Sequence, residues 1–311
     1  MQHDKRQRIG RGTLLPAAAG GLLTMTAVAG EYRLQNGALE ARIAVPTVTK
    51  EAGQRFDALG SVTSLTWRGH AILSHDGLLD EFNIQNVPPP GYTNAAVGQV
   101  FLKPGIGELV RDGDKPYEFW HSYPVGRLAD TRVTRHDAAL LRCEQRLDGT
   151  NGWGYLYAKE YRLDPDGRSL AIGYRLENTG RKELLVEQYN HNWFACSAAC
   201  AVRLETGFDV ADAAAPWLAP SGRVWRLTAP LTQAAYFGCP ATSAPAASNV
   251  FALVRYDGVR IDVSGDFALA SFAVFATPAA FCPEAFGLWR VAPGESRAWE
   301  RRYRLSEAAT R

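Results

Sequence analysis

Apolar and polar residues alternate in short runs from Glu31 onward, and turn residues separate these runs. Alternation with a period of two is the pattern of extended strands that bury one face. In the stretch from Tyr32 to Val45, the pair Asn36-Gly37 lies between two such runs, which is typical of a two-residue hairpin turn. Helical periodicity is almost absent from the chain. The pattern therefore predicts an antiparallel, all-β structure.

Three further pairs of alternating runs are separated by short segments rich in Gly, Asp or Pro. These segments are Arg68-Gly69, Asp164-Pro165-Asp166-Gly167 and Asp257-Gly258. Such residues favour tight turns, because glycine accepts positive φ angles and proline fixes φ. Each segment is therefore predicted to close a hairpin, which leaves little of the chain for helices.

Two longer stretches interrupt this pattern: residues 86–98, which contain Pro88-Pro89-Pro90-Gly91, and residues 211–222, which are rich in alanine and proline. Both are predicted to be surface loops. Loops of this length in a compact domain often cover or line a functional site. A plain insertion is the alternative for each of them.

The composition is that of an ordinary soluble globular protein. Of the 311 residues, 46% are hydrophobic and 21% are charged, so the chain can bury a substantial core. No repeat with a period of about 20 to 50 residues indicates a propeller or a solenoid. Because all-β sandwiches and barrels often exceed about 200 residues as one unit, we predict a single β domain over residues 30–311.

The charge distribution argues against a nucleic-acid partner. The chain has 34 basic and 32 acidic residues, for a formal net charge of +2, and much of the excess lies before residue 12. A nucleic-acid-binding surface would need a basic stripe. The one dense basic cluster farther along the sequence contains Arg301, Arg302 and Arg304. We interpret this cluster as a solvated sheet edge, since an alternating strand would divide it between two faces.

Residues 1–29 have the layout of an export signal, with a basic start, a weakly apolar stretch from Leu14 to Val28 and small residues before Gly30. A disordered leader is the alternative, because Pro16 and two adjacent glycines interrupt the apolar stretch. We expect export to the periplasm or the extracellular space, with a cytoplasmic location as the alternative. No later segment reaches the run of about 18 apolar residues that spans a membrane, so we expect no membrane partner.

The five cysteines are too few for a disulfide scaffold, and an odd number cannot all pair within one chain. A local bridge between Cys196 and Cys200 would suit an exported protein. Metal binding by this pair is disfavoured, because structural zinc sites use closer cysteine spacings and a second matched pair. We therefore predict no metal site.

Of the six histidines, His191 has the most distinctive surroundings. It follows a predicted strand from Glu183 to Tyr189, in the run Tyr189-Asn190-His191-Asn192-Trp193-Phe194. Sugar-binding sites combine a few polar groups for the hydroxyls with aromatic walls, which is the mixture found here. His121 is a second histidine among aromatic residues, in Glu118-Phe119-Trp120-His121-Ser122-Tyr123. The alternative is a pair of half-buried histidines bonded to nearby carbonyls.

The remaining histidines of the predicted domain are His70, His75 and His136. Each lies beside a turn signal, so we expect exposed turn or loop residues.

The segment Asn190-His191-Asn192-Trp193-Phe194 resembles the histidine motif of the galactose mutarotase-like superfamily, which includes the aldose 1-epimerases. Other segments resemble this superfamily in the same order along the chain. They are Leu34 to Ala41, Leu59 to Trp67, Leu176 to Gly180 and Phe281 to Phe286. The resemblance covers nearly the whole chain after the first 29 residues. It implies a large antiparallel β supersandwich whose concave face binds a sugar.

The resemblance also implies the chemistry of the site. In this superfamily the motif histidine is the general acid and a late glutamate is the general base, and these positions match His191 and Glu284. Glu284 follows a predicted strand from Phe267 to Thr277 and lies in a Cys-Pro-Glu segment like that of several relatives. An exposed loop carboxylate is the alternative for Glu284. The resemblance implies no cofactor.

Two segments of well-studied epimerases, Asn-Arg-Ile and His-Gly-Gly, are absent from this chain. In roughly their places stand the segments from Phe101 to Gly107 and from Trp120 to Ser122. Lys103 is therefore predicted to supply the cation of the site and His121 its second histidine. Together with Asn190 and Trp193, these are the predicted substrate-binding residues.

Interconversion of sugar anomers needs a base at the anomeric hydroxyl and an acid at the ring oxygen. Glu284 and His191, with ordinary pKa values of about 4.3 and about 6.5, suit these roles, and a nearby carboxylate would raise the histidine pKa. We predict an aldose 1-epimerase-like isomerase for a monosaccharide or a glycan-derived sugar. A non-catalytic carbohydrate-binding protein of the same fold is the first alternative, and a carbohydrate lyase or hydrolase is the second.

Overall fold

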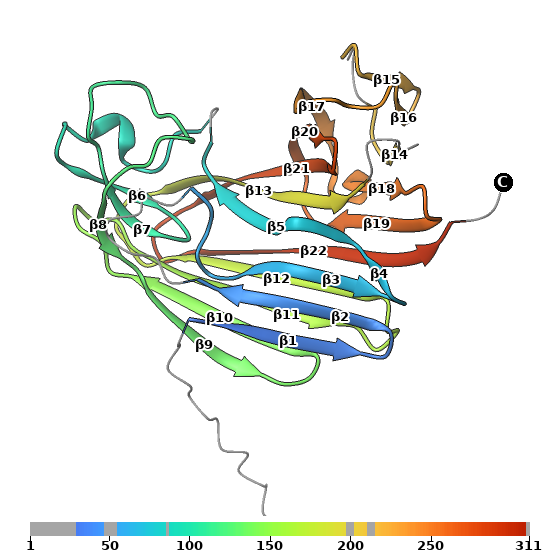
Figure 1. Ribbon diagram of the computed structural model, residues 1–311. Helices are drawn as coiled ribbons and strands as arrows, with labels where there is room; N and C mark the ends of the chain where they lie inside the picture. Colours follow the sequence, from blue (N-terminus) through green and yellow to red (C-terminus); the bar gives the residue numbers. More distant parts are fainter. Residues whose placement is uncertain (1–28, 47–54, 85–86, 197–201, 210–214, 309–311) are drawn as a thin grey trace, which may run out of the picture.

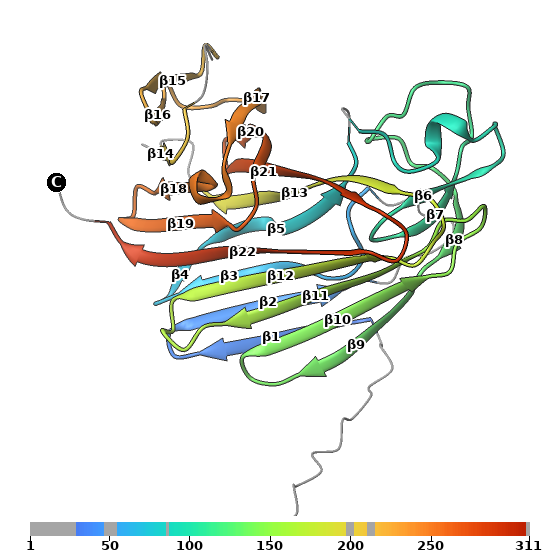
Figure 2. The ribbon, with the colours of Figure 1, turned by 180° about the vertical axis from the view of Figure 1, so that it is seen from behind.

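The computed structural model describes residues 29–46, 55–84, 87–196, 202–209 and 215–308. In this part of the chain, two large antiparallel sheets lie against each other and a smaller sheet stands at one end of them (Figure 1). The view from behind shows the same two layers, with the smaller sheet again next to the beginning of β13 (Figure 2). The prediction of an all-β fold made of large antiparallel sheets is confirmed.

The first large sheet has nine strands among the described residues. In order across the sheet these are β1 (Gly30–Asn36), β2 (Leu39–Val45), β3 (Ser61–Trp67), β5 (Leu73–Phe82), β13 (Leu184–Ala195), β21 (Ala280–Val291), β20 (Leu269–Thr277) and β17 (Ala235–Ala244), with β4 (His70–Ala71) beside β3. The central strand β13 pairs with β5 on one side and with β21 on the other.

The second large sheet has ten strands in the same described ranges. Their order is β15 (Leu218–Ser221), β16 (Val224–Leu227), β14 (Arg203–Thr206), β18 (Val250–Val254), β19 (Val259–Gly265), β22 (Ser296–Glu307), β12 (Ser169–Asn178), β11 (Tyr155–Leu163), β10 (Leu140–Leu147) and β9 (Asp130–His136). The small sheet contains β6 (Val100–Lys103), β7 (Gly107–Val110) and β8 (Val125–Leu128). Short 3₁₀ helices cover Tyr92–Asn94 (η1) and Ala246–Ser248 (η2).

All four predicted turns close hairpins between consecutive strands. Across the first of them Asn36 pairs with Leu39, and Gly37 has a φ of +57°, as a tight hairpin turn requires. The other three turns join β3 to β4, β11 to β12 and β18 to β19. Local turn chemistry therefore determines these connections, as the sequence predicted.

The core lies between the two large sheets and follows the alternating pattern. On β2 the residues Leu39, Ala41, Ile43 and Val45 are all buried, and they belong to the main apolar cluster. Strand β11 alternates in the same way, but its buried face carries Lys159. A lysine in this position needs compensating charges, because an unpaired ion in an apolar interior is strongly unfavourable.

Two aspartates compensate Lys159 inside the core. Its Nζ forms ion pairs with Asp80 and with Asp57 Oδ2, the latter at 3.4 Å, and donates to the carbonyl oxygen of Gly60 at 2.6 Å. Although burial alone would lower the pKa of Lys159, the two carboxylates raise it well above its ordinary value. We call Lys159, Asp57 and Asp80 the buried ionic cluster. It joins the ten-stranded sheet to strand β5 of the nine-stranded sheet and to the segment that precedes β3.

Strand β22 does not form the solvated edge expected for its arginines. It lies inside the ten-stranded sheet between β19 and β12, and the side chain of Arg301 is buried. Arg301 donates to the carbonyl of Ala285 and lies 4.7 Å from the centre of the Phe267 ring. In the middle of the strand, Arg302 and Arg304 lie on the other face, where Arg302 is partly exposed and Arg304 is exposed.

The prediction of two surface loops is only partly correct. Residues 87–98 contain η1, and Leu218–Ser221 form strand β15, while residues 85–86 and 210–214 lie outside the described part. The predicted signal or leader and the Cys196–Cys200 bridge stay predictions, because residues 1–28 and 197–201 also lie outside it. No helix among the described residues is long and apolar enough to cross a bilayer.

We predict that Lys159→Met destabilises the protein by about 3–5 kcal/mol, because it leaves two buried carboxylates without their cation. The free energy of unfolding, measured with a chemical denaturant, tests this. Lys115→Met is the control, since Lys115 is exposed and should change stability by less than about 0.5 kcal/mol.

Addition of Asp57→Asn and Asp80→Asn to Lys159→Met removes the uncompensated charges and should recover part of the lost stability. If Lys159→Met unfolds no more easily than the Lys115 control, the buried ionic cluster does not stabilise the fold.

Candidate active site

Strand β13 places its residues on two faces of the nine-stranded sheet. Asn190 and Asn192 bond to Tyr174 and Tyr303 of the other large sheet, so even-numbered residues face the interior. His191 and its odd-numbered neighbours point to the opposite face, which we call the site face. The predicted strand was too short, because β13 continues through His191 to Ala195.

Glu284 lies inside strand β21, which runs beside β13. The same register holds at both ends of this strand pair, and it places Glu284 opposite His191. His191 Nδ1 and Glu284 Oε1 are 3.0 Å apart. Glu284 is therefore not an exposed loop carboxylate, and the two predicted catalytic residues are in direct contact.

Burial sets the protonation of this pair. His191 is 6% exposed and Glu284 is 4% exposed. The ring of Trp193 stacks on the imidazole at 4.6 Å, and the rings of Phe275 and Phe56 meet it edge-on at 5.6 and 6.2 Å. In such surroundings the charged form of each group is disfavoured.

The pKa of Glu284 is raised well above its ordinary value by burial. Burial, together with the nearby charge of Arg55, lowers the pKa of His191 to about 3. The expectation that the neighbouring carboxylate raises the histidine pKa is not met, because burial and the charge of Arg55 both oppose protonation of the imidazole. Both pKa shifts favour the neutral form of the pair, with the exchangeable proton on the carboxyl group.

Arg55 provides a cation that the sequence analysis missed. Its Nε donates to Glu81 Oε2 at 2.9 Å, and a terminal nitrogen donates to the Tyr189 hydroxyl at 3.1 Å. The Tyr189 hydroxyl in turn donates to Glu81 Oε2 at 2.7 Å. The guanidinium lies over the rings of Phe56 and Phe119, at 4.7 and 4.4 Å. No pattern in the sequence distinguishes Arg55 from the other arginines.

Lys103, the predicted cation, is buried next to Glu81, near the end of β5. It is 1% exposed and donates to the carbonyls of Phe82 and Asn83, at 2.5 and 3.2 Å, and to the Tyr117 hydroxyl at 2.9 Å. Burial lowers its pKa to about 8. Its Nζ is 3.8 Å from Glu81 Oε1, so it supports the carboxylate that holds Arg55. Because its three protons are already donated, Lys103 is not placed to bind a sugar.

The other predicted binding residues divide between the two faces. Trp193 lies on the site face, stacked on His191. Asn190 faces the interior, where it donates to Asp80 and to the Tyr174 hydroxyl, so it is not placed to touch a ligand beside His191. His121 lies in the loop between β7 and β8, with its Nε2 2.8 Å from Asp112 Oδ2. Among the described residues no hydrogen bond, ion pair or ring contact joins His121 to His191, so this part of the predicted site is not assembled as expected.

The other histidines of the domain are His70, His75 and His136. His75 is a highly exposed strand residue of β5, and His136 ends β9, exposed to solvent. His70 is half-buried and 3.2 Å from Asp257. All three depart from the expected turn or loop positions, because each lies in a strand, His136 as the last residue of β9.

The site face also holds buried polar atoms that have no hydrogen-bond partner among the described residues. They are Glu187 Oε2 and Trp193 Nε1. Buried polar groups are normally satisfied by protein, water or ligand. No group of three or more His, Cys, Asp or Glu among the described residues has the arrangement of a metal site.

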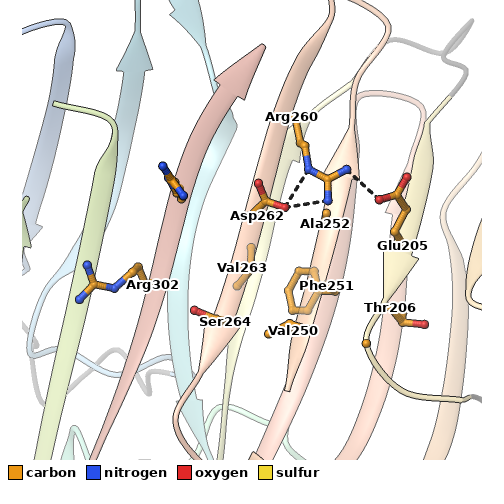
Figure 3. Close-up of a pocket in the computed structure, with 12 residues that line it drawn as sticks. Glu205, Thr206, Val250, Phe251, Ala252, Arg260, Asp262, Val263, Ser264 and Arg302 are labelled. Atoms are coloured by element: carbon orange, nitrogen blue, oxygen red, sulfur yellow. Dashed lines mark hydrogen bonds and ion pairs between the residues drawn. The ribbon is translucent and has the colours of Figure 1, made fainter. Parts of the chain in front are cut away.

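A cavity of about 380 Å³ lies elsewhere, on the outer face of the ten-stranded sheet. Its lining comes from β14, β18, β19 and β22, and includes Arg260, which is paired with Asp262 and Glu205 (Figure 3). None of the predicted site residues lines this cavity. We therefore place the candidate active site on the site face, where the paired acid and base are, and not in this cavity.

No protein-family model and no curated protein sequence matches the chain. Solved structures do resemble it. A proposed aldose 1-epimerase from Escherichia coli K12 aligns with 90% of this chain and 100% of its own, at a TM-score of 0.59 and 14% identity. A galactose mutarotase related enzyme from Lactobacillus acidophilus aligns with 90% of this chain and 99% of its own, at a TM-score of 0.57 and 12% identity. The chain has the galactose mutarotase fold.

A GalM/aldose epimerase homologue from C. elegans also shares the mutarotase fold, over 90% of this chain and 100% of its own, at a TM-score of 0.54 and 14% identity. The predicted resemblance is thereby confirmed at the level of the fold. Identities this low show the architecture alone, so the chemistry of the site depends on the residues of this chain.

We predict that Arg55→Met raises the pKa of His191 toward its ordinary value, because it removes a positive charge that opposes protonation of the imidazole. Titration of the His191 side-chain nitrogens by NMR measures this, with the signal assigned by comparison with His191→Asn. A His191 pKa that stays the same or falls in the Arg55 variant would contradict the electrostatic coupling.

Proposed function

We propose that the site face binds an aldose and interconverts its anomers by acid–base catalysis. The observation that carries this proposal is the 3.0 Å contact between His191 and Glu284 on adjacent strands. A buried acid next to a buried base, with shifted pKa values and aromatic walls, is the arrangement expected of a proton-transfer site. The fold supports the proposal, because it is shared with proteins described as mutarotases and aldose epimerases.

The protons can be balanced within the pair. Protonated Glu284 donates to His191 Nδ1, so the neutral imidazole carries its own hydrogen on Nε2. His191 gives the Nε2 proton to the ring oxygen of the sugar and receives the Glu284 proton at Nδ1. The second oxygen of Glu284 takes the proton of the anomeric hydroxyl. The ring opens to the aldehyde, which rotates, and reversal of these transfers closes it on the other face.

In this scheme His191 is the acid and Glu284 the base, as the sequence predicted, but neither group becomes an isolated buried ion. Net charge on the pair stays at zero throughout, which suits an apolar environment. Trp193 and the aromatic residues around His191 provide surface for the C–H face of the sugar. No metal or organic cofactor enters the proposed steps.

We predict that Glu284→Gln and His191→Asn each slow anomer exchange by about 10²- to 10⁴-fold, because each removes a positioned proton transfer. The double variant should be no slower than the slower single variant, since the two residues act as a unit. Exchange of a panel of aldoses, followed by NMR, measures the rates. His75→Asn, at a highly exposed position on β5, is the control and should keep the wild-type rate.

This experiment also separates the proposed enzyme from a sugar-binding protein of the same fold. If the wild-type protein binds an aldose but accelerates the exchange of none, catalysis is ruled out and the binding alternative holds. Release of reducing ends from an oligosaccharide would instead favour a hydrolase.

The pH dependence follows from the two pKa shifts. The pair works with one exchangeable proton, which it keeps from above the lowered His191 pKa of about 3 up to the raised Glu284 pKa. We therefore predict that kcat/KM stays constant down to about pH 4 and falls on the alkaline side only when Glu284 loses its proton, above the ordinary glutamate pKa. If Glu284 and His191 were exposed, with their ordinary pKa values, the pH profile of kcat/KM would be bell-shaped between about pH 4.3 and about pH 6.5. A maximum of kcat/KM near about pH 5.5 would therefore contradict the buried, neutral pair.

Export of the protein remains a separate proposal that depends on residues 1–29. Fractionation of the producing cells, with and without these residues, tests it.

A further inference from the structure

The loop between β7 and β8 carries an aromatic side chain on the surface. Trp120 is 61% exposed, whereas the neighbouring ring of Phe119 packs against it edge-on at 4.8 Å. Single exposed apolar residues are common and need no special explanation. Trp120 is of interest because of its connection to the candidate active site.

A continuous series of ring contacts connects Trp120 to the catalytic pair. Phe119 lies over the guanidinium of Arg55, Arg55 lies over Phe56, and Phe56 meets the His191 ring edge-on at 6.2 Å. Arg55 is itself held by Glu81 and Tyr189 on the site face. The loop that carries Trp120 is therefore joined to the site face through Phe119 and Arg55.

Polar groups flank the exposed ring. His121 and Asp112 form a pair at 2.8 Å, and their side chains are 43% and 35% exposed. His121 is packed edge-on against Tyr123, at 4.5 Å, which limits its motion. A flat aromatic surface beside ordered, accessible hydrogen-bonding groups matches a saccharide unit, which presents both a C–H face and hydroxyls.

We propose that Trp120, with the His121–Asp112 pair, forms an outer subsite for a second sugar unit. The inference rests on the proposed function and names its substrate class: reducing oligosaccharides or the reducing end of a glycan. The sugar at His191 must have a free anomeric hydroxyl to be interconverted, so the second unit is attached through another of its hydroxyls. The small sheet and its loops stand next to the beginning of β13 (Figure 1).

The test compares disaccharides with their own reducing monosaccharides. Binding and anomer exchange are measured for maltose and cellobiose against glucose, and for lactose against glucose, with wild-type protein and Trp120→Ala. We expect the variant to lose about tenfold in affinity for a disaccharide that the wild type prefers. Binding and exchange of glucose should be unchanged.

Two further variants make the result specific. Trp120→Phe keeps an aromatic surface and should restore most of the disaccharide affinity. Tyr256→Ala removes a ring of similar exposure, 59%, in the β18–β19 hairpin, and should have no effect on either ligand.

The outcomes separate the subsite from the proposed function. Equal effects of Trp120→Ala on mono- and disaccharides, or no wild-type preference for any disaccharide, overturn the subsite while the monosaccharide data still decide the function. If the protein binds no saccharide at all, both proposals fail. Loss confined to a disaccharide, with recovery in Trp120→Phe, supports the subsite.

Discussion

The arrangement of the site depends on the buried ionic cluster of Lys159, Asp57 and Asp80. Lys159 projects from the ten-stranded sheet into the core and pairs with Asp80 of β5 and with Asp57, which precedes β3. Asp57 comes two residues after Arg55, and Asp80 comes immediately before Glu81. One cation therefore fixes both chain segments that bring charge to the site face. Because a buried charge without its partner is so costly, alternative positions of these segments are disfavoured.

Asp80 extends this constraint to strand β13. Its Oδ1 accepts from Gln188 at 2.8 Å and from Asn190, which lie on either side of Tyr189 in β13. The inward amides thus anchor the strand from the interior, while Tyr189 and His191 lie on the site face. Asn190 was predicted to bind substrate, but its side chain holds the strand that presents His191. Its role in the motif is therefore positional.

Desolvation links the architecture to the proposed chemistry. The aromatic residues around His191 and Glu284 lower one pKa and raise the other, so the pair can relay a proton without forming an isolated ion. The same burial raises the pKa of Glu187, on the site face, to about 7. Arg55 is the partly exposed cation among these groups, and Glu81 and Tyr189 hold it in a fixed orientation. A neutral ligand with several hydroxyls suits such surroundings better than one that adds another negative charge.

The sequence by itself determined the all-β architecture, the four hairpins and the two residues that meet at the site. The architecture and the hairpins depend on local alternation and turn chemistry, which are present in the linear chain. His191 and Glu284 were named through a family resemblance carried by the motif around His191 and by the Cys-Pro-Glu segment. Only the tertiary structure decided which cation and which faces belong to the site. Strand pairing and the buried ionic cluster bring Arg55 and Glu81 together, and His121 is directed outward. No local sequence pattern indicates either arrangement. Protonation of the His191–Glu284 pair was also decided there, because desolvation arises only when distant strands enclose both groups.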